Sequence, residues 1–141
     1  YTDAVQMGVE TDGGLLVLYM RLAEAVPGVS TDVEQLAYAF YLDADGDASW
    51  DYIADIENLE SGLYNPVFFD LAAGLSFEGE QYPGFATLEG RDISLSLPLD
   101  ILGCPDSIGV RGATERIQGD SQAGDEVPDK TSQWLRIATG C

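Results

Sequence analysis

Short runs of apolar residues alternate with turn-forming residues along the whole chain. The runs are rich in β-branched and aromatic residues, and clusters of glycine, aspartate and asparagine separate them. This spacing is typical of a β-sandwich or barrel, in which each short strand buries at least one face. The segments predicted as strands are Val5–Glu10, Leu15–Leu22, Leu36–Leu42, Tyr52–Leu59, Leu63–Leu71, Gly84–Leu88, Ile93–Leu97, Ile108–Ile117 and Trp134–Thr139.

The connections between these runs point to the same fold class. The Asp12–Gly14 stretch predicts a hairpin turn, Leu99–Leu102 predicts one helical turn closed by Gly103, and Gln118–Lys130 predicts a long polar loop. No segment of useful length has a helical period. We therefore predict an all-β fold: a single antiparallel β-sandwich, jelly-roll-like, with about eight or nine strands. A chain of 141 residues fits one such domain over its whole length.

The stretch between the third and fourth predicted strands carries the most distinctive chemistry. Asp43, Asp45 and Asp47 alternate around Gly46, and Asp51 follows four residues after Asp47. A hard cation such as Ca²⁺ takes roughly six to eight oxygen ligands at about 2.3–2.6 Å, and alternating acids on a tight loop supply them. We predict that these four carboxylates bind calcium (Ca2+ as the cofactor). The alternative is a solvated acidic turn.

This acidic stretch differs from an EF-hand in three respects. Its glycine comes two positions early, and Ala54 stands where a bidentate glutamate would close a twelve-residue loop. The apolar runs on both sides predict strands, whereas an EF-hand loop joins helices. The predicted site is therefore a strand-to-strand loop.

The charge balance is strongly acidic. Six Lys and Arg residues stand against 25 Asp and Glu residues, a net charge of −19. Nucleic acids are bound by cations that neutralise phosphates, so we expect no nucleic-acid partner. Self-repulsion at this density has to be screened by salt or bound cations, so a saline habitat and a calcium-bearing extracellular setting both fit. No apolar run approaches the roughly 18–20 residues of a membrane span.

Two cysteines, Cys104 and Cys141, lie 37 positions apart, and the chain has no histidine. The spacing fits no zinc motif, and the even count suits an oxidising compartment, so we predict a disulfide between them. Two reduced thiols, or pairing of Cys141 with another chain, are the alternatives. The disulfide indicates an extracellular or cell-surface location.

The sequence offers little for catalysis. Without histidine, the Ser-His-Asp and Cys-His arrangements cannot form. A glycosidase needs only two carboxylates about 5–10 Å apart. Here no pair stands out by an apolar setting that would raise the pKa of one carboxyl group. We therefore expect that the protein is not an enzyme and has no catalytic residues.

The order of these features resembles a known group of extracellular domains. The features are an apolar strand entering the acidic loop (Tyr41–Asp47), a second strand beginning at Asp51–Tyr52, the Leu95–Gly103 segment, and Asp125–Asp129 followed by Trp134. Over Leu15–Trp134 the chain is similar to DOMON-like and family-nine carbohydrate-binding-module-like β-sandwiches. The resemblance implies a jelly-roll fold, a structural calcium ion and attachment to secreted hydrolases or cell-surface proteins.

Family members that bind sugars clamp them between aromatic rings, which implies a ligand-binding role for Trp50 and Tyr52. Trp50 either stacks on a sugar face or packs as a lid over the acidic loop, whereas Trp134 is predicted in the core. We expect a non-catalytic, calcium-stabilised module that binds glycan or another surface ligand. The alternative is a structural subunit of an extracellular filament or surface layer, assembled by strand exchange with Val5–Val9 as the donated segment.

Overall fold

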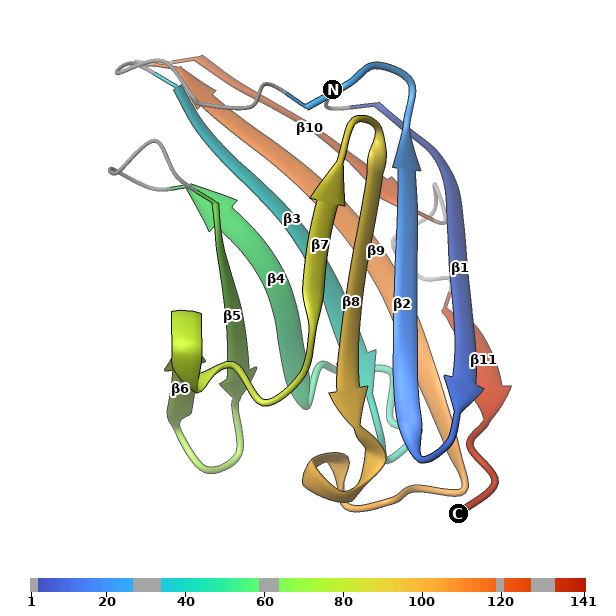
Figure 1. Ribbon diagram of the computed structural model, residues 1–141. Coiled ribbons are helices and arrows are strands. Elements are labelled where there is room, and N and C mark those ends of the chain that lie inside the picture. Colours follow the sequence, from blue (N-terminus) through green and yellow to red (C-terminus); the bar gives the residue numbers. More distant parts are fainter. Residues whose placement is uncertain (1–2, 27–33, 59–63, 119–120, 128–133) are drawn as a thin grey trace.

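The computed structural model describes residues 3–26, 34–58, 64–118, 121–127 and 134–141, and these are built almost entirely from β-strands (Figure 1). The strands are β1 (Ala4–Asp12), β2 (Leu15–Leu22), β3 (Glu34–Asp43), β4 (Tyr52–Asn58), β5 (Asn65–Asp70), β6 (Leu75–Glu78), β7 (Ala86–Glu89), β8 (Asp92–Pro98), β9 (Ser107–Gln118), β10 (Ser121–Val127) and β11 (Leu135–Ala138). Two short 3-10 helices accompany them, η1 (Gly79–Gln81) and η2 (Leu99–Leu102). The predicted all-β class is confirmed, and η2 is the helical turn expected before Gly103.

The strands form two antiparallel sheets that face each other (Figure 1). The four-stranded sheet has the order β1-β2-β8-β7. The seven-stranded sheet has the order β10-β9-β3-β4-β5-β6, and β11 also pairs with β9. The chain changes sheet after β2, after β6 and again after β8. As a result, β2 pairs with β8 in one sheet while β3 pairs with β9 in the other. The predicted antiparallel β-sandwich is therefore confirmed.

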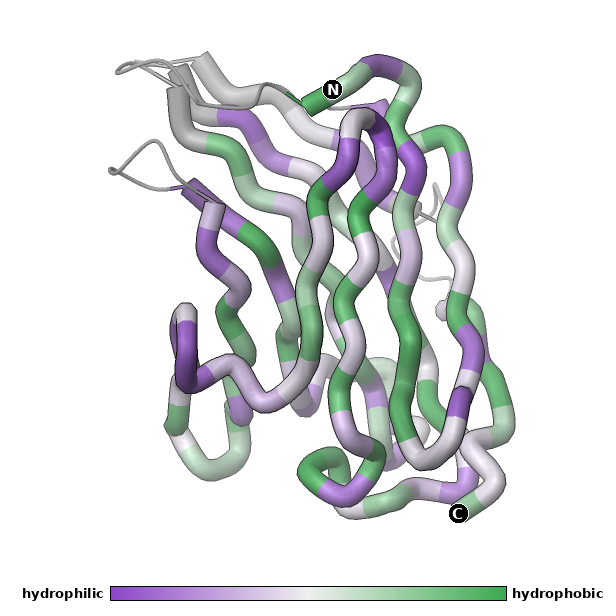
Figure 2. Tube along the Cα trace, viewed as in Figure 1, coloured by the Kyte–Doolittle hydropathy of each residue, from purple (hydrophilic) through white to green (hydrophobic). Residues whose placement is uncertain are grey.

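The core lies between the sheets and follows the alternation seen in the sequence. On β2, Leu16, Leu18, Met20 and Leu22 are fully buried, because every second side chain of a strand points to the same face. Figure 2 shows green and pale segments alternating along β8, whereas the part of β2 next to its turn with β1 is green throughout. The fully buried residues of the other central strands are Leu36, Tyr38, Phe40 and Leu42 on β3, Ile93, Leu95 and Leu97 on β8, and Ile108 and Val110 on β9.

Two strands were not predicted. β10 lies inside Gln118–Lys130, which we had predicted as a polar loop, and it pairs with β9 from Ser121↔Gln118 to Val127↔Gly112. The sequence of β10 has no alternation of apolar and polar residues, so β10 is extended because it pairs with the long strand β9. At Gly124 an added Cβ would lie 2.3 Å from the Thr114 carbonyl oxygen, so glycine permits the close approach. β6 is equally inconspicuous because most of its side chains are exposed.

The ends of the chain are held by different contacts. At one end, β1 pairs with β2, and the Ala4 amide donates a hydrogen bond to Asp125 Oδ2 of β10 at 2.9 Å. At the other, β11 pairs with β9, and the predicted Cys104–Cys141 disulfide is formed with a Cα–Cα distance of 5.5 Å. Within the described residues, no helix is long and apolar enough to cross a bilayer.

Trp134 does not lie in the core, contrary to the prediction. It is half-buried immediately before β11, and the Arg111 guanidinium carbon lies 5.6 Å from its ring centroid. Arg111 faces away from the core cluster, on the outer surface of the seven-stranded sheet. A large aromatic side chain next to a strand is typical of a core residue, but the Trp134 ring packs over the buried Arg111 instead.

Candidate metal centre

The acidic loop connects two neighbouring strands of the seven-stranded sheet. β3 ends at Asp43 and β4 begins at Tyr52, and the Asp51 amide donates to the Leu42 carbonyl oxygen at 2.8 Å. The loop turns sharply through Gly46, whose φ is 80°, and Ala48, whose φ is 63°. Glycine adopts such a conformation readily, whereas alanine in the left-handed region is strained by about 1 kcal/mol or more. Because β3 and β4 are antiparallel neighbours, the two ends of this loop lie side by side at the same end of the sheet.

This turn brings the four predicted ligands together. Asp43, Asp45, Asp47 and Asp51 each offer one carboxylate oxygen, and these four oxygens lie within 4.8 Å of one another. Oxygens that share a calcium ion at about 2.4 Å can be at most about 4.8 Å apart, on opposite sides of the ion. The donor set is composed of carboxylates, which suits a hard cation. The cluster could hold a metal ion and meets the geometric condition for it.

Hydrogen bonds within the loop hold these carboxylates in place. Asp43 accepts bonds from the Gly46 amide (2.9 Å, Oδ1) and the Ala48 amide (3.0 Å, Oδ2). Asp51 Oδ2 accepts from the Ala44 amide at 2.8 Å, and Asp45 Oδ1 accepts from the Asp47 amide at 3.1 Å. Each aspartate thus satisfies backbone donors of its own loop, as acidic side chains in turns commonly do. These bonds hold the four carboxylates close together within the loop.

Among the residues that the structure describes, Arg136 supplies the positive charge that contacts this cluster. Its Nη2 lies 2.6 Å from Oδ2 of Asp43, which is only 1% exposed. Arg136 is on β11, which lies opposite Gly109 of β9. A Cβ at Gly109 would come within 2.8 Å of the same Nη2, so glycine leaves the space through which the guanidinium reaches Asp43.

The remaining charges repel one another. The hydrogen bond from the Asp47 amide lowers the pKa of Asp45, but hydrogen bonds shared with the carboxyl groups of Asp47 and Asp43 outweigh it and the net pKa is raised. The pKa of Asp47 is lowered, chiefly because its Oδ1 accepts from the Ser49 hydroxyl at 2.7 Å. The opposite directions of the two pKa shifts reflect the mutual repulsion of crowded carboxylates. A bound cation would offset that repulsion.

The two aromatic residues predicted to bind ligand lie on different faces of the sheet. Trp50 stacks on Tyr41 of β3 with ring centroids 4.3 Å apart and stays 47% exposed. Tyr52 packs against the core and stacks on Phe68 at 5.7 Å. The structure therefore places Trp50 at the surface beside the acidic loop and does not bring Tyr52 to the same surface. Trp50 covers Tyr41.

A buried carboxyl group lies on the same outer surface, and sequence reasoning missed it. Asp55 of β4 is 6% exposed between Ala39 and Val67 of the adjacent strands, and its Oδ1 has no hydrogen-bond partner. Burial raises the pKa of Asp55 to about 8, and the nearby Glu57 and Glu78 add to the effect. The sequence singled out no pair of carboxyl groups by an apolar setting, whereas the structure shows one carboxyl group, Asp55, in such a setting. The alternation along β4 predicts that Asp55 lies on the face of the sheet turned away from the core. The sequence does not show that neighbouring residues bury this outer position.

The structure thus joins a carboxylate cluster, an arginine and an exposed stacked tryptophan at one end of the β3–β4 pair. Asp55 lies farther along β4, on the outer face of the sheet. The four ligands came from one stretch of sequence, whereas Arg136 and Tyr41 are brought to them by strand pairing. Comparison of the chain with family models, with curated proteins and with solved structures found no match.

Proposed function

We propose that this protein is a non-catalytic, secreted or cell-surface β-sandwich module in which a calcium ion bound by the Asp43–Asp51 loop stabilises the fold and positions Trp50 to bind a glycan or another surface ligand. The observation that carries this proposal is the convergence of four carboxylates in a loop that also presents an exposed tryptophan. The intramolecular disulfide is compatible with an oxidising extracellular setting. The resemblance to DOMON-like and family-nine carbohydrate-binding domains supports the same function.

Asp43, Asp45, Asp47 and Asp51 would hold the ion, and the ion would supply positive charge to a cluster in which four carboxylates face one arginine. The chain contributes a preformed arrangement of these side chains, because amide donors of the loop already fix each one. Preorganisation of this kind reduces the ordering that binding would otherwise require. Calcium is favoured over magnesium because a loop of carboxylates tolerates an irregular coordination shell, whereas magnesium demands near-octahedral geometry.

The ligand would contact the outer surface around Trp50. An exposed ring that is held flat by a second ring suits stacking on the apolar face of a sugar, since aromatic area is available at little conformational cost. Tyr41 lies opposite Arg111 of β9, and Arg111 Nη2 donates to Glu126 Oε2 at 3.1 Å. Polar groups beside an aromatic platform are the usual means of fixing a ligand's orientation.

The Asp47→Asn substitution removes one negative charge from the loop and keeps the oxygen on which the turn depends. We expect Asp47→Asn to weaken calcium binding by roughly tenfold or more, because affinity in such loops depends on the number of charged ligands. Asparagine keeps an oxygen that can accept the Ser49 amide, now 2.8 Å from Asp47 Oδ1, so the turn should persist. Calorimetric titration with calcium measures the effect. The matched control is Asp100→Asn, an exposed acid on η2, and equal affinities for the two variants would contradict the proposed site.

Trp50 should control ligand binding without controlling the fold. We expect Trp50→Ala to lose retention on a glycan array in calcium by about tenfold, since a stacked aromatic ring is often a dominant contact, while Trp50→Phe retains most of it. Phe85→Ala is the control, because Phe85 is 73% exposed and precedes β7 on the other sheet. Unchanged retention of the Trp50→Ala variant, or no retention of the wild type on any glycan, would refute the sugar-binding role.

The filament alternative has no comparable observation in its favour. The segment expected to be donated, Val5–Val9, lies in β1 and pairs with β2 of its own sheet. Because β1 is already paired within its own sheet, the structure does not favour its donation to another chain.

A further inference from the structure

One edge of the four-stranded sheet has no partner among the described strands. β7 pairs with β8, and the described strands provide no neighbour on its other side. The opposing sheet continues beyond this edge through β4, β5 and β6 (Figure 1). The smaller sheet therefore ends before the larger one, and a further strand placed beside β7 would lie over the inner surface of β4 and β5.

The backbone of β7 is oriented to accept such a strand. The Ser96 amide donates to the Phe85 carbonyl oxygen at 2.8 Å, so Phe85 belongs to a hydrogen-bonded pair with β8. Because these pairs alternate along an antiparallel ladder, Thr87 and Glu89 also point their amides toward β8. Ala86 and Leu88 then point their amides and carbonyls away from β8, toward the edge without a partner. These groups are the donors and acceptors that β-augmentation uses.

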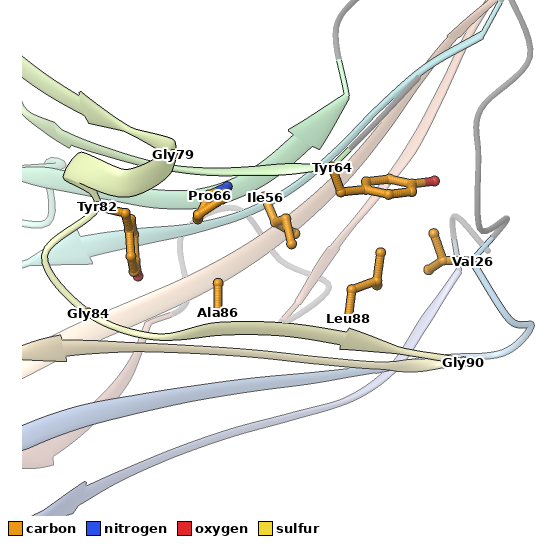
Figure 3. A pocket seen from close by; sticks show the side chains of 10 residues that line it. All are labelled: Val26, Ile56, Tyr64, Pro66, Gly79, Tyr82, Gly84, Ala86, Leu88 and Gly90. Carbon is orange, nitrogen blue, oxygen red and sulfur yellow. The ribbon is translucent and has the colours of Figure 1, made fainter. Parts of the chain in front are cut away.

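The side chains of the same two residues line a cleft of ≈ 430 Å³ between the sheets, whose surface is about equally polar and apolar. Figure 3 shows Ala86 and Leu88 on one side, facing Ile56, Tyr64 and Pro66 of the other sheet, with Val26 at one end. In the described part of the chain, the residues that line the cleft carry no charge. An added strand would therefore place apolar side chains into the cleft and form backbone hydrogen bonds with β7 at the same time.

The surroundings of the cleft favour a basic partner. The exposed Glu80 and Glu89 each adjoin a lining residue, at opposite ends of the cleft, and Arg91 follows at the Glu89 end. The chain as a whole carries a net charge of −19 with six basic residues. A second copy of this chain would bring the same excess of negative charge, which opposes association. A strand with Lys or Arg on its outward face would be attracted instead.

We propose that β7 and this cleft form an acceptor site for an extended, basic segment of another protein, which adds to the four-stranded sheet as a fifth, antiparallel strand. Its inward residues are apolar and fill the cleft, and its outward residues are cationic. The site is separate from the acidic loop and does not depend on the proposed calcium or glycan binding.

A synthetic nine-residue peptide, Lys-Val-Thr-Val-Lys-Val-Thr-Val-Lys with blocked ends, provides the probe. We expect it to bind with a Kd below about 100 μM at low salt and to slow amide hydrogen exchange at Ala86 and Leu88 by about tenfold or more. The amides of Thr87 and Glu89 should be protected already in the free protein. Exchange measured by NMR with and without peptide therefore reports the location and direction of the added strand.

Three modified peptides separate the contribution of the backbone hydrogen bonds from that of the charge. In antiparallel pairing the residues that face the cleft also bond to β7, so N-methylation of the valines should abolish binding, whereas N-methylation of the threonines should not. A peptide with Glu in place of Lys should bind at least about tenfold more weakly, because its charge has the sign of the protein's own. Equal binding of all four peptides would overturn the proposal.

Two protein variants complete the test. Leu88→Gln puts a polar amide into the cleft and should weaken peptide binding by about tenfold or more, whereas Thr87→Gln, the same uncharged change on the exposed outer face of the same strand, should leave it unchanged. Protection of Ala86 and Leu88 on raising the protein concentration alone would show that a second copy occupies the edge, and would also overturn the proposal. If the amides of Ala86 and Leu88 gain no protection from exchange in an excess of the unmodified peptide, the proposal is also overturned.

Discussion

The Asp55→Asn variant should be more stable than the wild type at pH 9 and equally stable at pH 4. An unfolded aspartate has a pKa of about 3.9, whereas burial raises the pKa of Asp55 to about 8 in the folded protein. Between these values the folded state holds a proton that the unfolded state has lost, so the wild-type free energy of unfolding falls as the pH rises. Asparagine has no such proton. We expect the variant to gain about 2–5 kcal/mol at pH 9.

Urea unfolding at pH 4, 7 and 9, with calcium held constant, measures this difference. Asp100→Asn is again the control, because Asp100 is exposed on η2 and should leave the pH dependence unchanged. If Asp55→Asn shows the same loss of stability with rising pH as the wild type, then Asp55 does not lie in a desolvated setting. Glu57 and Glu78 would have to be tested in its place, since their charges add to the raised pKa.

Removal of the disulfide should destabilise the protein by about 3–4 kcal/mol, the chain-entropy value for a loop of this length. The Cys104–Cys141 bond closes 37 positions of sequence and ties the last residue to the segment after η2. Without it, β11 is held by its pairing with β9 and by the Thr139 amide, which donates to the Asp106 carbonyl oxygen at 3.0 Å. The C-terminal strand should therefore loosen first.

The double variant Cys104→Ser, Cys141→Ser tests this, compared with the oxidised wild type in urea. Hydrogen exchange of the β11 amides should rise more than that of the β3 amides, because β3 lies inside the sheet between β4 and β9. A loss below about 1 kcal/mol would mean that the disulfide constrains the unfolded chain far less than the loop length implies. Peptide mapping without reductant confirms that the bond forms within one chain.

The sequence predicted the central part of the fold because the apolar pattern there is determined by burial. β2, β3 and β8 alternate or are continuously apolar, and their inward residues are the buried core. The pattern could not predict β10, which is polar and takes its register from β9, or β6, which is short and mostly exposed. Trp134 was misplaced because a large aromatic side chain can also be buried against a cation, here Arg111.

The candidate site was predicted to a similar extent. The four aspartates are close in sequence, so local chain geometry is enough to bring them together. Arg136 contacts Asp43 across 93 positions, and only the pairing of β11 with β9 creates that contact. The burial of Asp55 likewise depends on the strands on either side of β4, and the order of the strands in the sheet cannot be read from the sequence. Long-range pairing is therefore what sequence reasoning lacked at this site.

Thermal unfolding of the wild type in calcium and in excess chelator tests the central claim most directly. Binding to the folded state alone at a concentration of about 100 times Kd adds about 2.7 kcal/mol, which corresponds to a rise in Tm on the order of 10 °C for a chain of this size. Magnesium at equal ionic strength controls for screening of the negative charge. The proposed site predicts a saturable rise with calcium that Asp47→Asn loses. Equal Tm values in calcium and chelator, or an equal rise with magnesium and with the variant, would contradict it.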